Sequence, residues 1–235
     1  MSTATRFARY LAVTLALMVG GTASAQLPAE SAAWKVRKED APIRISTLDM
    51  PNSDFDAFKA ETVMDAPIRA VMAVLATPKS CTEWMHNCLY SEALPGGDFN
   101  KRYGYSINDL PWPVKDRDVA LELTTTNDLQ TGEIHVLMVA KEGLREEHPD
   151  YVRVHHSETL YILRPLTDDK TVVVWIQHTE PNGALPSWLV NALLIDIPYY
   201  SLRKFGELVK TPAYQDRDIT FDDQGRIIGM HPRTQ

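Results

Sequence analysis

The sequence predicts an α+β fold in which a curved antiparallel sheet grips one long C-terminal helix around an interior space. Three observations support this prediction. Segments with alternating apolar and polar residues follow one another through the middle of the chain, joined by short turns. The helices are segregated from these strands rather than alternating with them. A helical periodicity of about six turns then extends from Gly183 to Lys210.

Residues 1–25 are predicted to be a signal peptide. Arg6 and Arg9 precede an apolar run at 11–19, and small residues up to Ala25 provide a cleavage site. The apolar run is too short to span a membrane comfortably, although a retained membrane anchor is the alternative. We therefore expect a periplasmic or secreted protein.

The mature chain, of about 210 residues, is long enough for one domain with a sizeable core. We expect three parts after the signal peptide: a linker at residues 26–33, a folded domain at residues 34–211 and a polar tail at residues 212–235. The tail has the sequence of a weak hairpin at 219–230.

The domain is predicted to begin with strands and two short helices. Residues 34–40 are compatible with a short strand or with the end of a helix. Asp65 is a helix-capping residue, and Pro67 suits a first helical turn. The predicted elements are strands at 43–47 and 55–64 and helices at 67–77 and 79–85.

A run of strands in meander order is predicted next. The segment from Leu110 to Pro113 interrupts this run as a rigid extended stretch, because each proline fixes φ and disfavours helix in the residue before it. The predicted strands are 99–107, 118–126, 134–140, 151–163 and 171–179.

The long helix is unusually apolar in its first half. Ser187 is a good N-cap, and between Trp188 and Tyr200 only Asn191 and Asp196 are conspicuously polar. A helix that is apolar most of the way round is covered on more than one side. We therefore expect this helix to cover the sheet and to close over something held beneath it.

Pro198 divides the long helix into two halves. Residues 188–197 are almost wholly apolar and are expected to line a ligand, whereas residues 199–210 are amphipathic and are expected to anchor the helix. Pro198 removes a helix hydrogen bond and can kink the helix. Two interpretations stay open, namely a hinge for a lid and a fixed bend that fits the curved sheet.

Charge excludes some classes of partner. The formal net charge is −7, and the loss of Arg6 and Arg9 with the signal peptide would make it −9. An acidic chain without a basic cluster is a poor candidate for binding nucleic acid, so no nucleic-acid partner is expected. Purely electrostatic binding to anionic lipid is equally disfavoured.

The two cysteines, Cys81 and Cys88, are expected to form a disulfide, which is the default in an oxidising compartment. Seven residues along a straight helix would separate their Cα atoms by about 10.5 Å, whereas a disulfide needs less than about 7 Å. The pair therefore requires a break in the helix, which residues 85–87 could supply. The spacing fits neither a redox C-x-x-C motif nor a zinc site, and no metal or cofactor is predicted.

Enzyme signatures are missing from the sequence. It has no G-x-S-x-G elbow, no H-E-x-x-H motif and no phosphate-cradling glycine loop. Glu83 and His86 are the nearest approach to an acid–base pair, but a solvated helix face explains them better.

Four local signatures in the same order make the chain resemble the START domain family, a group of lipid-binding proteins with a helix-grip fold. They are Cys81–Trp84, a proline-rich approach to an Arg-Asp pair at 111–118, Val152-Arg153, and the Gly-x-x-Pro-x-Trp stretch that leads into the last helix at 183–191. The resemblance covers residues 34–210.

The resemblance implies a hydrophobic tunnel between sheet and C-terminal helix that holds one lipid. It also implies that the helix and nearby loops move to admit the lipid. We further expect transient membrane contact, transfer of the lipid between membranes and a monomeric protein. Cholesterol-binding members carry a second arginine six residues after the Arg-Asp pair, where this chain has Leu123. The cavity is therefore expected to be drier there, and sterol, phospholipid, fatty acid and hopanoid all remain open.

Candidate ligand-binding residues come from the strands and the long helix. The apolar or amphipathic candidates are Tyr103, Tyr105, Leu123, Met138, Trp175, Trp188, Asn191, Leu194, Ile195, Pro198 and Leu202. Arg117 and His155 are the polar candidates, while a paired structural role is the alternative for Arg117 and for Arg153. Two other functions remain as alternatives: an enzyme similar to polyketide cyclases and hydrolases on the same fold, and an interaction module with a solidly packed interior.

Overall fold

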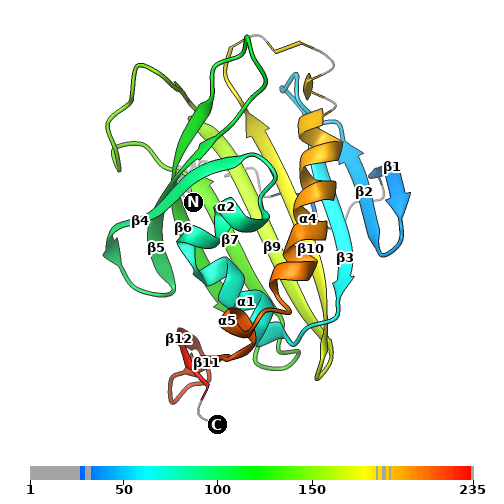
Figure 1. Ribbon diagram of the computed structural model, residues 1–235, viewed down its shortest axis with the longest axis vertical. Coiled ribbons are helices and arrows are strands. Elements are labelled where there is room, and N and C mark those ends of the chain that lie inside the picture. Colours follow the sequence, from blue (N-terminus) through cyan, green and yellow to red (C-terminus); the bar gives the residue numbers. More distant parts are fainter. Residues whose placement is uncertain (1–26, 30–32, 184, 187–188, 191, 234–235) are drawn as a thin grey trace, which may run out of the picture.

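The computed structural model describes residues 27–29, 33–183, 185–186, 189–190 and 192–233. Within them, one curved ten-stranded sheet has the order β1-β2-β3-β10-β9-β7-β6-β5-β4 (Figure 1). These neighbours are antiparallel, and the short β8 adds a parallel pairing to β6. Its strands are β1 Lys35–Asp40, β2 Ile43–Leu48, β3 Ala57–Met64, β4 Cys88–Gly97, β5 Lys101–Asn108, β6 Arg117–Asn127, β7 Ile134–Ala140, β8 Val152–Arg153, β9 His156–Thr167 and β10 Lys170–Glu180.

The helices cover the concave face of the sheet (Figure 1). The described elements are α1 Ile68–Ala76, a 3-10 turn Pro78–Ser80, α2 Cys81–Trp84, a π-helical turn Ala192–Asp196, α4 Ile197–Leu208 and α5 Pro212–Gln215. None of them is both long and apolar enough to cross a membrane within the described residues. The predicted α+β helix-grip architecture is confirmed: an antiparallel sheet grips the last long helix.

An aromatic cluster joins the helices to the sheet. The Trp84 ring of α2 stacks on Phe205 of α4 at a centroid distance of 4.7 Å and meets Trp175 of β10 at 5.9 Å. Tyr161 of β9 stacks on Trp175 at 5.4 Å. Such aromatic pairs add to the free energy gained from the buried area itself. The second half of the long helix is therefore fixed to the core, as its amphipathic pattern predicts.

The predicted long helix changes its hydrogen-bonding pattern part-way along, without a gap between the π-helical and the α-helical residues. A π turn at Ala192–Asp196 precedes α4, and Pro198 lies in the first turn of α4. Proline has no N–H, so it cannot donate the α-helical bond to residue 194. A widened π turn at this junction is the local consequence, and such turns often occur at functional sites.

Three strands differ from the predicted ones. β4 was not predicted, because its sequence contains Pro95, Gly96 and Gly97. It forms an edge of the sheet, where proline and glycine are tolerated. The long strand predicted at 151–163 is divided into β8 and β9, which pair with different neighbours.

Both ends of the described chain pack against the domain. Leu27, in the segment expected to be a linker, is only 5 % exposed and contacts the outer face of the sheet at Ile162, Val174 and Ile176. In the segment expected to be a polar tail, α5 is followed by a two-stranded hairpin, β11 Arg217–Phe221 and β12 Ile227–Pro232. The buried side chains of this C-terminal segment belong to the hydrophobic core of the domain. They include Tyr214 of α5, Ile219 of β11 and Ile227 of β12.

The predicted disulfide is confirmed. Cys81 and Cys88 are bonded, with their Cα atoms 5.9 Å apart. The chain makes the required break directly after α2, where Met85 adopts an extended conformation. The bond therefore holds the short helix that carries Trp84 to the start of the edge strand β4.

Candidate ligand-binding cavity

Two adjoining chambers lie between the concave face of the sheet and the helices. The first has a volume of about 170 Å³ and the second a volume of about 190 Å³. Five residues border both chambers: Met85, Asn108, Val119, Ser157 and Gln177. Together the two volumes reach the lower end of the roughly 300–1,000 Å³ typical of small-molecule sites.

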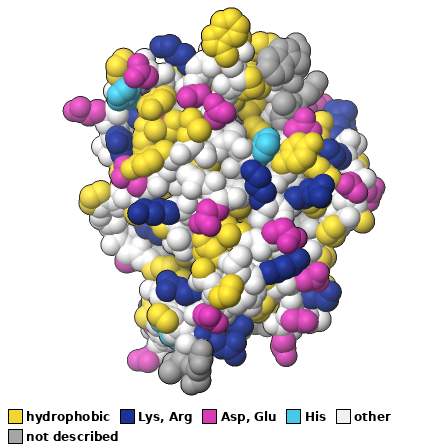
Figure 2. All heavy atoms as spheres, in the orientation of Figure 1, with side chains coloured by type: hydrophobic (Ala, Val, Ile, Leu, Met, Phe, Trp, Pro, Cys, Tyr) yellow, Lys and Arg dark blue, Asp and Glu magenta, His cyan; other side chains and the backbone are white. Residues whose placement is uncertain are grey.

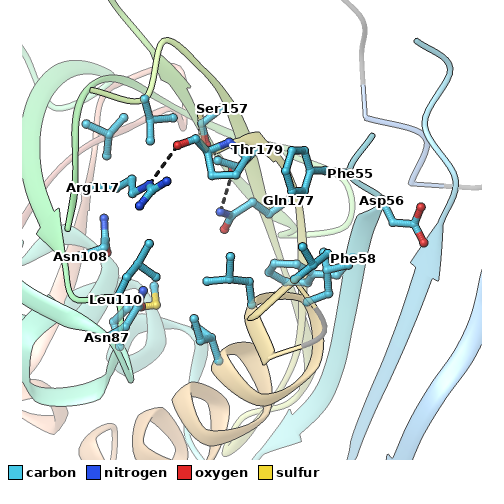
Figure 3. A pocket seen from close by; sticks show the side chains of 18 of the residues that line it. Phe55, Asp56, Phe58, Asn87, Asn108, Leu110, Arg117, Ser157, Gln177 and Thr179 are labelled. Atoms are coloured by element: carbon cyan, nitrogen blue, oxygen red, sulfur yellow. Dashed lines mark hydrogen bonds between the residues drawn. The ribbon is translucent and has the colours of Figure 1, made fainter. Parts of the chain in front are cut away.

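The first chamber lies beneath the π turn. Leu193, Leu194 and Ile197 from the helical segment face Phe58 and Trp175 from the sheet across it. Polar side chains are fewer, and three of them are bonded to one another: the Ser157 hydroxyl lies 2.8 Å from that of Thr179, which accepts a 2.9 Å bond from the amide of Gln177 (Figure 3). The chamber is thus a mainly apolar space with a short row of hydrogen-bonded polar side chains along one wall.

Arg117 closes one side of the first chamber by binding backbone oxygens. Its Nε donates to the carbonyl of Pro181 at 3.0 Å and its Nη2 to that of Asn182 at 2.8 Å. Asn182 and Gly183 both have positive φ, so the chain turns sharply where it leaves β10. Arg117 therefore fixes the turn that leads toward the π turn, and within the described residues it forms no ion pair.

The second chamber lies between β4–β7, β9 and the region from the end of α1 to α2. Small residues Gly104 and Ser106 occupy the inward positions of β5, opposite Leu121 and Val119 of β6. The inward Arg102 lies near the far end of this strand, directly opposite Leu123. The small side chains leave room along β5 that larger residues would fill.

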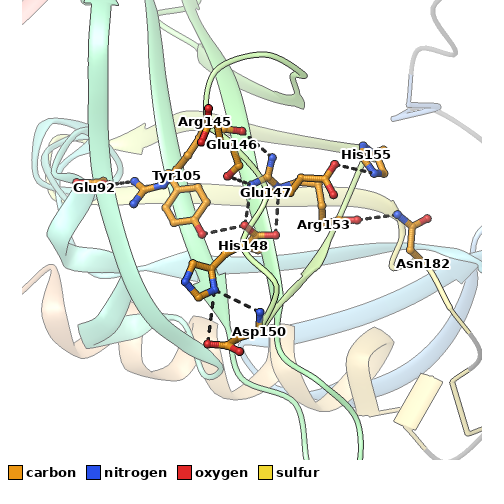
Figure 4. Close-up of polar contacts among 11 residues, drawn as sticks. Glu92, Tyr105, Arg145, Glu146, Glu147, His148, Asp150, Arg153, His155 and Asn182 are labelled. Carbon is orange, nitrogen blue, oxygen red and sulfur yellow. Dashed lines mark hydrogen bonds and ion pairs between the residues drawn. The ribbon is translucent and has the colours of Figure 1, made fainter.

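A buried ion pair lies on the opposite face of β6. Asp118 is fully buried, and Arg153 donates to its Oδ1 from Nε at 3.0 Å and to its Oδ2 from Nη2 at 2.8 Å (Figure 4). Tyr105 donates its hydroxyl to Oδ2 at 2.8 Å. Burial would raise the pKa of Asp118, but the bonds from Arg153 and Tyr105 and the Arg153 charge together lower it. The pair therefore remains ionised and has a structural role.

His155 lies outside the two chambers. Its ring faces Glu142 at 3.3 Å and Glu147 at 3.6 Å, in a polar depression lined by residues of 141–147 and 153–155 (Figure 4). It is therefore not positioned to contact a ligand held between sheet and helix, contrary to its place among the candidates. The polarity of the surrounding loop is the physical reason, because charged partners hold the imidazole at the surface.

The other sequence-predicted candidates fall into four groups. Leu123, Met138, Arg117, Trp175 and Leu194 border a chamber, whereas Leu202 and Pro198 are buried and Ile195 is half-buried, and these last three border neither chamber. Trp188 and Asn191 lie outside the described residues. Tyr103 and Tyr105 border the second chamber, but the register places their side chains with Glu122 and Ala120, on the outer face.

Sequence reasoning missed the inward polar residues. Arg102, Asn108, Ser157 and Gln177 all border a chamber. For β5, the alternation of residues predicts two opposite faces. The interpretation of Tyr103 and Tyr105 as cavity walls takes the outer face for the inner one, an error of one residue. The facing direction of a strand is reversed by such a shift.

Comparison with protein families decides the assignment, because the model of the START domain matches residues 23–197. The chain belongs to the START domain family. A curated Pseudomonas aeruginosa protein of unassigned function is 29 % identical over 172 residues, which cover 72 % of this chain and 83 % of that protein. START domain-containing protein 10 of human is 26 % identical over 54 % of this chain and 43 % of its own length.

Solved START structures share the fold. The crystal structure of a STAR-related lipid transfer protein fragment from Xanthomonas axonopodis is 26 % identical, with a TM-score of 0.69 over 76 % of this chain and 99 % of that one. Human STARD10 is 19 % identical, with a TM-score of 0.68 over 77 % of this chain and 74 % of its own. The fold predicted from the resemblance is thereby confirmed.

Proposed function

We propose that this START protein binds one lipid, with the hydrophobic part of the ligand in the two chambers between sheet and C-terminal helix. The observation that carries this proposal is the pair of adjoining chambers beneath an apolar π turn. Both have predominantly apolar walls with a few orienting polar groups, which is the composition of small-molecule sites. The similarity to a Xanthomonas protein described as a lipid transfer protein supports the same function.

The π turn is the part of the wall that opens to admit the lipid. It borders the first chamber through Leu193 and Leu194, whereas α4 is held in the core by Leu202 and Phe205. Pro198 marks the boundary between the two, and its missing N–H weakens the helix at that point. Motion is therefore expected before Pro198 and not after it, which favours the hinge over a fixed bend.

Loading requires contact with a membrane, and the loop between β5 and β6 supplies the contact. Trp112 in this loop is 91 % exposed, while its neighbour Leu110 is buried and borders the first chamber. The loop reaches the end of the molecule at which β10 leads into the helical segment (Figure 1), where apolar side chains project (Figure 2). Exposed tryptophan favours the membrane interface because its ring is amphipathic.

The protein is exported, and it transfers its lipid outside the cytoplasm. Residues 1–25 act as a cleaved signal peptide, and the Cys81–Cys88 disulfide suits an oxidising compartment. In that compartment a lipid carrier moves its ligand between membranes.

The test is to purify the exported protein under native conditions and to measure its mass before and after denaturation. The expected result is about one lipid per chain, identified by lipid mass spectrometry. Protein stripped of lipid should then take up a fluorescent lipid analogue with the same stoichiometry. An empty preparation that takes up no analogue would contradict the proposal.

A further inference from the structure

Arg102 is an unusual residue in the wall of the second chamber. Its Nη1 donates to the Phe99 carbonyl at 2.6 Å and to the Thr125 hydroxyl at 2.8 Å. Its Nη2 is buried and has no hydrogen-bond partner, and among the described residues it is the only buried side-chain nitrogen or oxygen in that condition. The guanidinium also forms no ion pair within the described part of the chain.

An uncompensated guanidinium is costly in this position. Burial lowers the pKa of Arg102, but an arginine side chain stays protonated in proteins and cannot escape the cost by losing its proton. The Phe99 ring, 5.0 Å from the guanidinium carbon, offers only a cation–π contact. Buried charges are otherwise paired in proteins, so an acidic group is missing from the surroundings of Arg102.

No acidic residue of the chamber supplies the missing charge. Among the described residues that border the second chamber, Glu92 is the one carboxylate, and it is bound by Arg145. Arg117, the corresponding cation of the first chamber, already donates to three backbone oxygens. Of the two arginines in the described part of the chain that border the chambers, Arg102 is therefore the one whose positive charge is less well compensated by hydrogen-bond acceptors.

We propose that Arg102 binds the anionic head group of the ligand, a carboxylate or a phosphate, so that the lipid is an acidic amphiphile. This inference rests on the proposed lipid-binding function. Because Nη1 is engaged, the edge formed by Nε and Nη2 faces no protein acceptor. That edge is the one that pairs with two oxygens of a carboxylate or phosphate in fork geometry.

The inner face of β5 provides the path for the apolar tail. From Arg102 it passes the small residues Gly104 and Ser106 to Asn108, which borders both chambers. Six residues of strand span about 20 Å. The tail thus extends from Arg102 toward the first chamber and ends beneath Leu193 and Leu194.

Binding of three fluorescent probes tests this assignment: a long-chain fatty acid, its methyl ester, and a lysophosphatidic acid with the same chain. The variant is Arg102→Met, which has a similar shape and no charge. The matched control is Lys101→Met, which removes the same charge one residue away, where Lys101 is exposed and paired with Glu122.

Arg102→Met should weaken binding of at least one acidic probe by about 10- to 100-fold, the range for a lost hydrogen bond to a charged group. Its affinity for the ester and its resistance to urea should not fall. A loss confined to the fatty acid assigns a carboxylate ligand, and a loss confined to lysophosphatidic acid assigns a phosphate ligand. Lys101→Met should bind all three probes like the wild type.

Equal affinity of the wild type for acid and ester would overturn the inference while leaving lipid binding intact. A variant that loses affinity for acid and ester alike, or that unfolds more easily, would assign Arg102 a structural role instead. If the wild type binds none of the probes, this inference fails, and the proposed function fails with it when the native preparation also contains no lipid.

Discussion

Arg153 and Asp118 form a two-pronged ion pair across the junction of β8 and β6. The two side chains come from positions that are direct register partners in the parallel pairing, and both are buried. Arg153 also donates to the carbonyls of Arg145 and Glu146, so the pair ties the 141–151 loop to the sheet. Tyr105 completes the arrangement from β5.

Removal of one partner of this pair should be strongly destabilising. Arg153→Met leaves the Asp118 carboxylate buried without its cation, and the expected loss in free energy of unfolding is about 3–5 kcal/mol. The control is Lys35→Met, which breaks the exposed Lys35–Asp49 pair and should cost at most about 1 kcal/mol. Urea unfolding measures both values, and similar costs for the two variants would show that the buried pair is not special.

Alkaline pH should remove the contribution of Tyr105. Burial, then the hydrogen bond to Asp118 and its charge, raise the pKa of Tyr105 to about 12, from 10.0. A raised pKa gives stability that is complete below the unfolded value and is lost as pH rises from about 10 through about 12. The stability gap between wild type and Tyr105→Phe should therefore shrink over this interval in urea unfolding. A gap that stays constant would contradict the raised pKa.

The disulfide should contribute measurably to stability although it closes a short loop. Chain entropy gives about 2–2.5 kcal/mol for the loop from Cys81 to Cys88. A reducing agent should lower the free energy of unfolding of the wild type by this amount. The Cys81→Ser/Cys88→Ser variant serves as control, because these are the two cysteines of the sequence and the variant should not respond to the reductant. A response of the double variant would show that the reductant acts elsewhere.

The local patterns predicted the fold well because alternation and helical periodicity are properties of neighbouring residues. They predicted the facing direction poorly where both faces of a strand carry large side chains. Along β5 the tyrosines were assigned inward, yet Gly104 and Ser106 line the chamber, since an open cavity needs small residues. A single amino-acid sequence gives no sign of which face of a strand must remain empty.

Long-range partners were beyond the reach of sequence patterns for a similar reason. Arg117-Asp118 and Val152-Arg153 were recognised as separate signatures, but the parallel pairing of β6 with β8 decides that Asp118 meets Arg153. Arg117 is then left to bind the carbonyls of the turn at 181–182. The π turn could not be predicted from the sequence either. The sequence shows Pro198, but it does not show how the hydrogen bonds of the preceding turn change.

Leu194→Arg should abolish lipid uptake without preventing folding. Leu194 is half-buried and borders the first chamber, so an arginine there would place an unpaired charge in the apolar space or block it. The matched control is Leu166→Arg at the exposed end of β9, where the side chain is 56 % accessible. Uptake of a fluorescent lipid by each purified variant is the measurement. Normal uptake by Leu194→Arg would remove the π turn from the ligand wall.

Trp112→Ser should slow lipid transfer from vesicles while leaving the affinity for a dispersed lipid analogue unchanged. Insertion of an exposed Trp112 into the interface gains the burial of a large aromatic surface, which the serine cannot supply. Leu129→Ser provides the control, since Leu129 is 65 % exposed beyond the other end of β6, about 36 Å of strand away from the loop. Vesicle co-sedimentation and transfer of a fluorescent lipid between vesicles measure the effect. If both variants transfer lipid like the wild type, the loop between β5 and β6 is not the membrane contact; if both are equally impaired, the effect is a general loss of surface hydrophobicity and not a property of this loop.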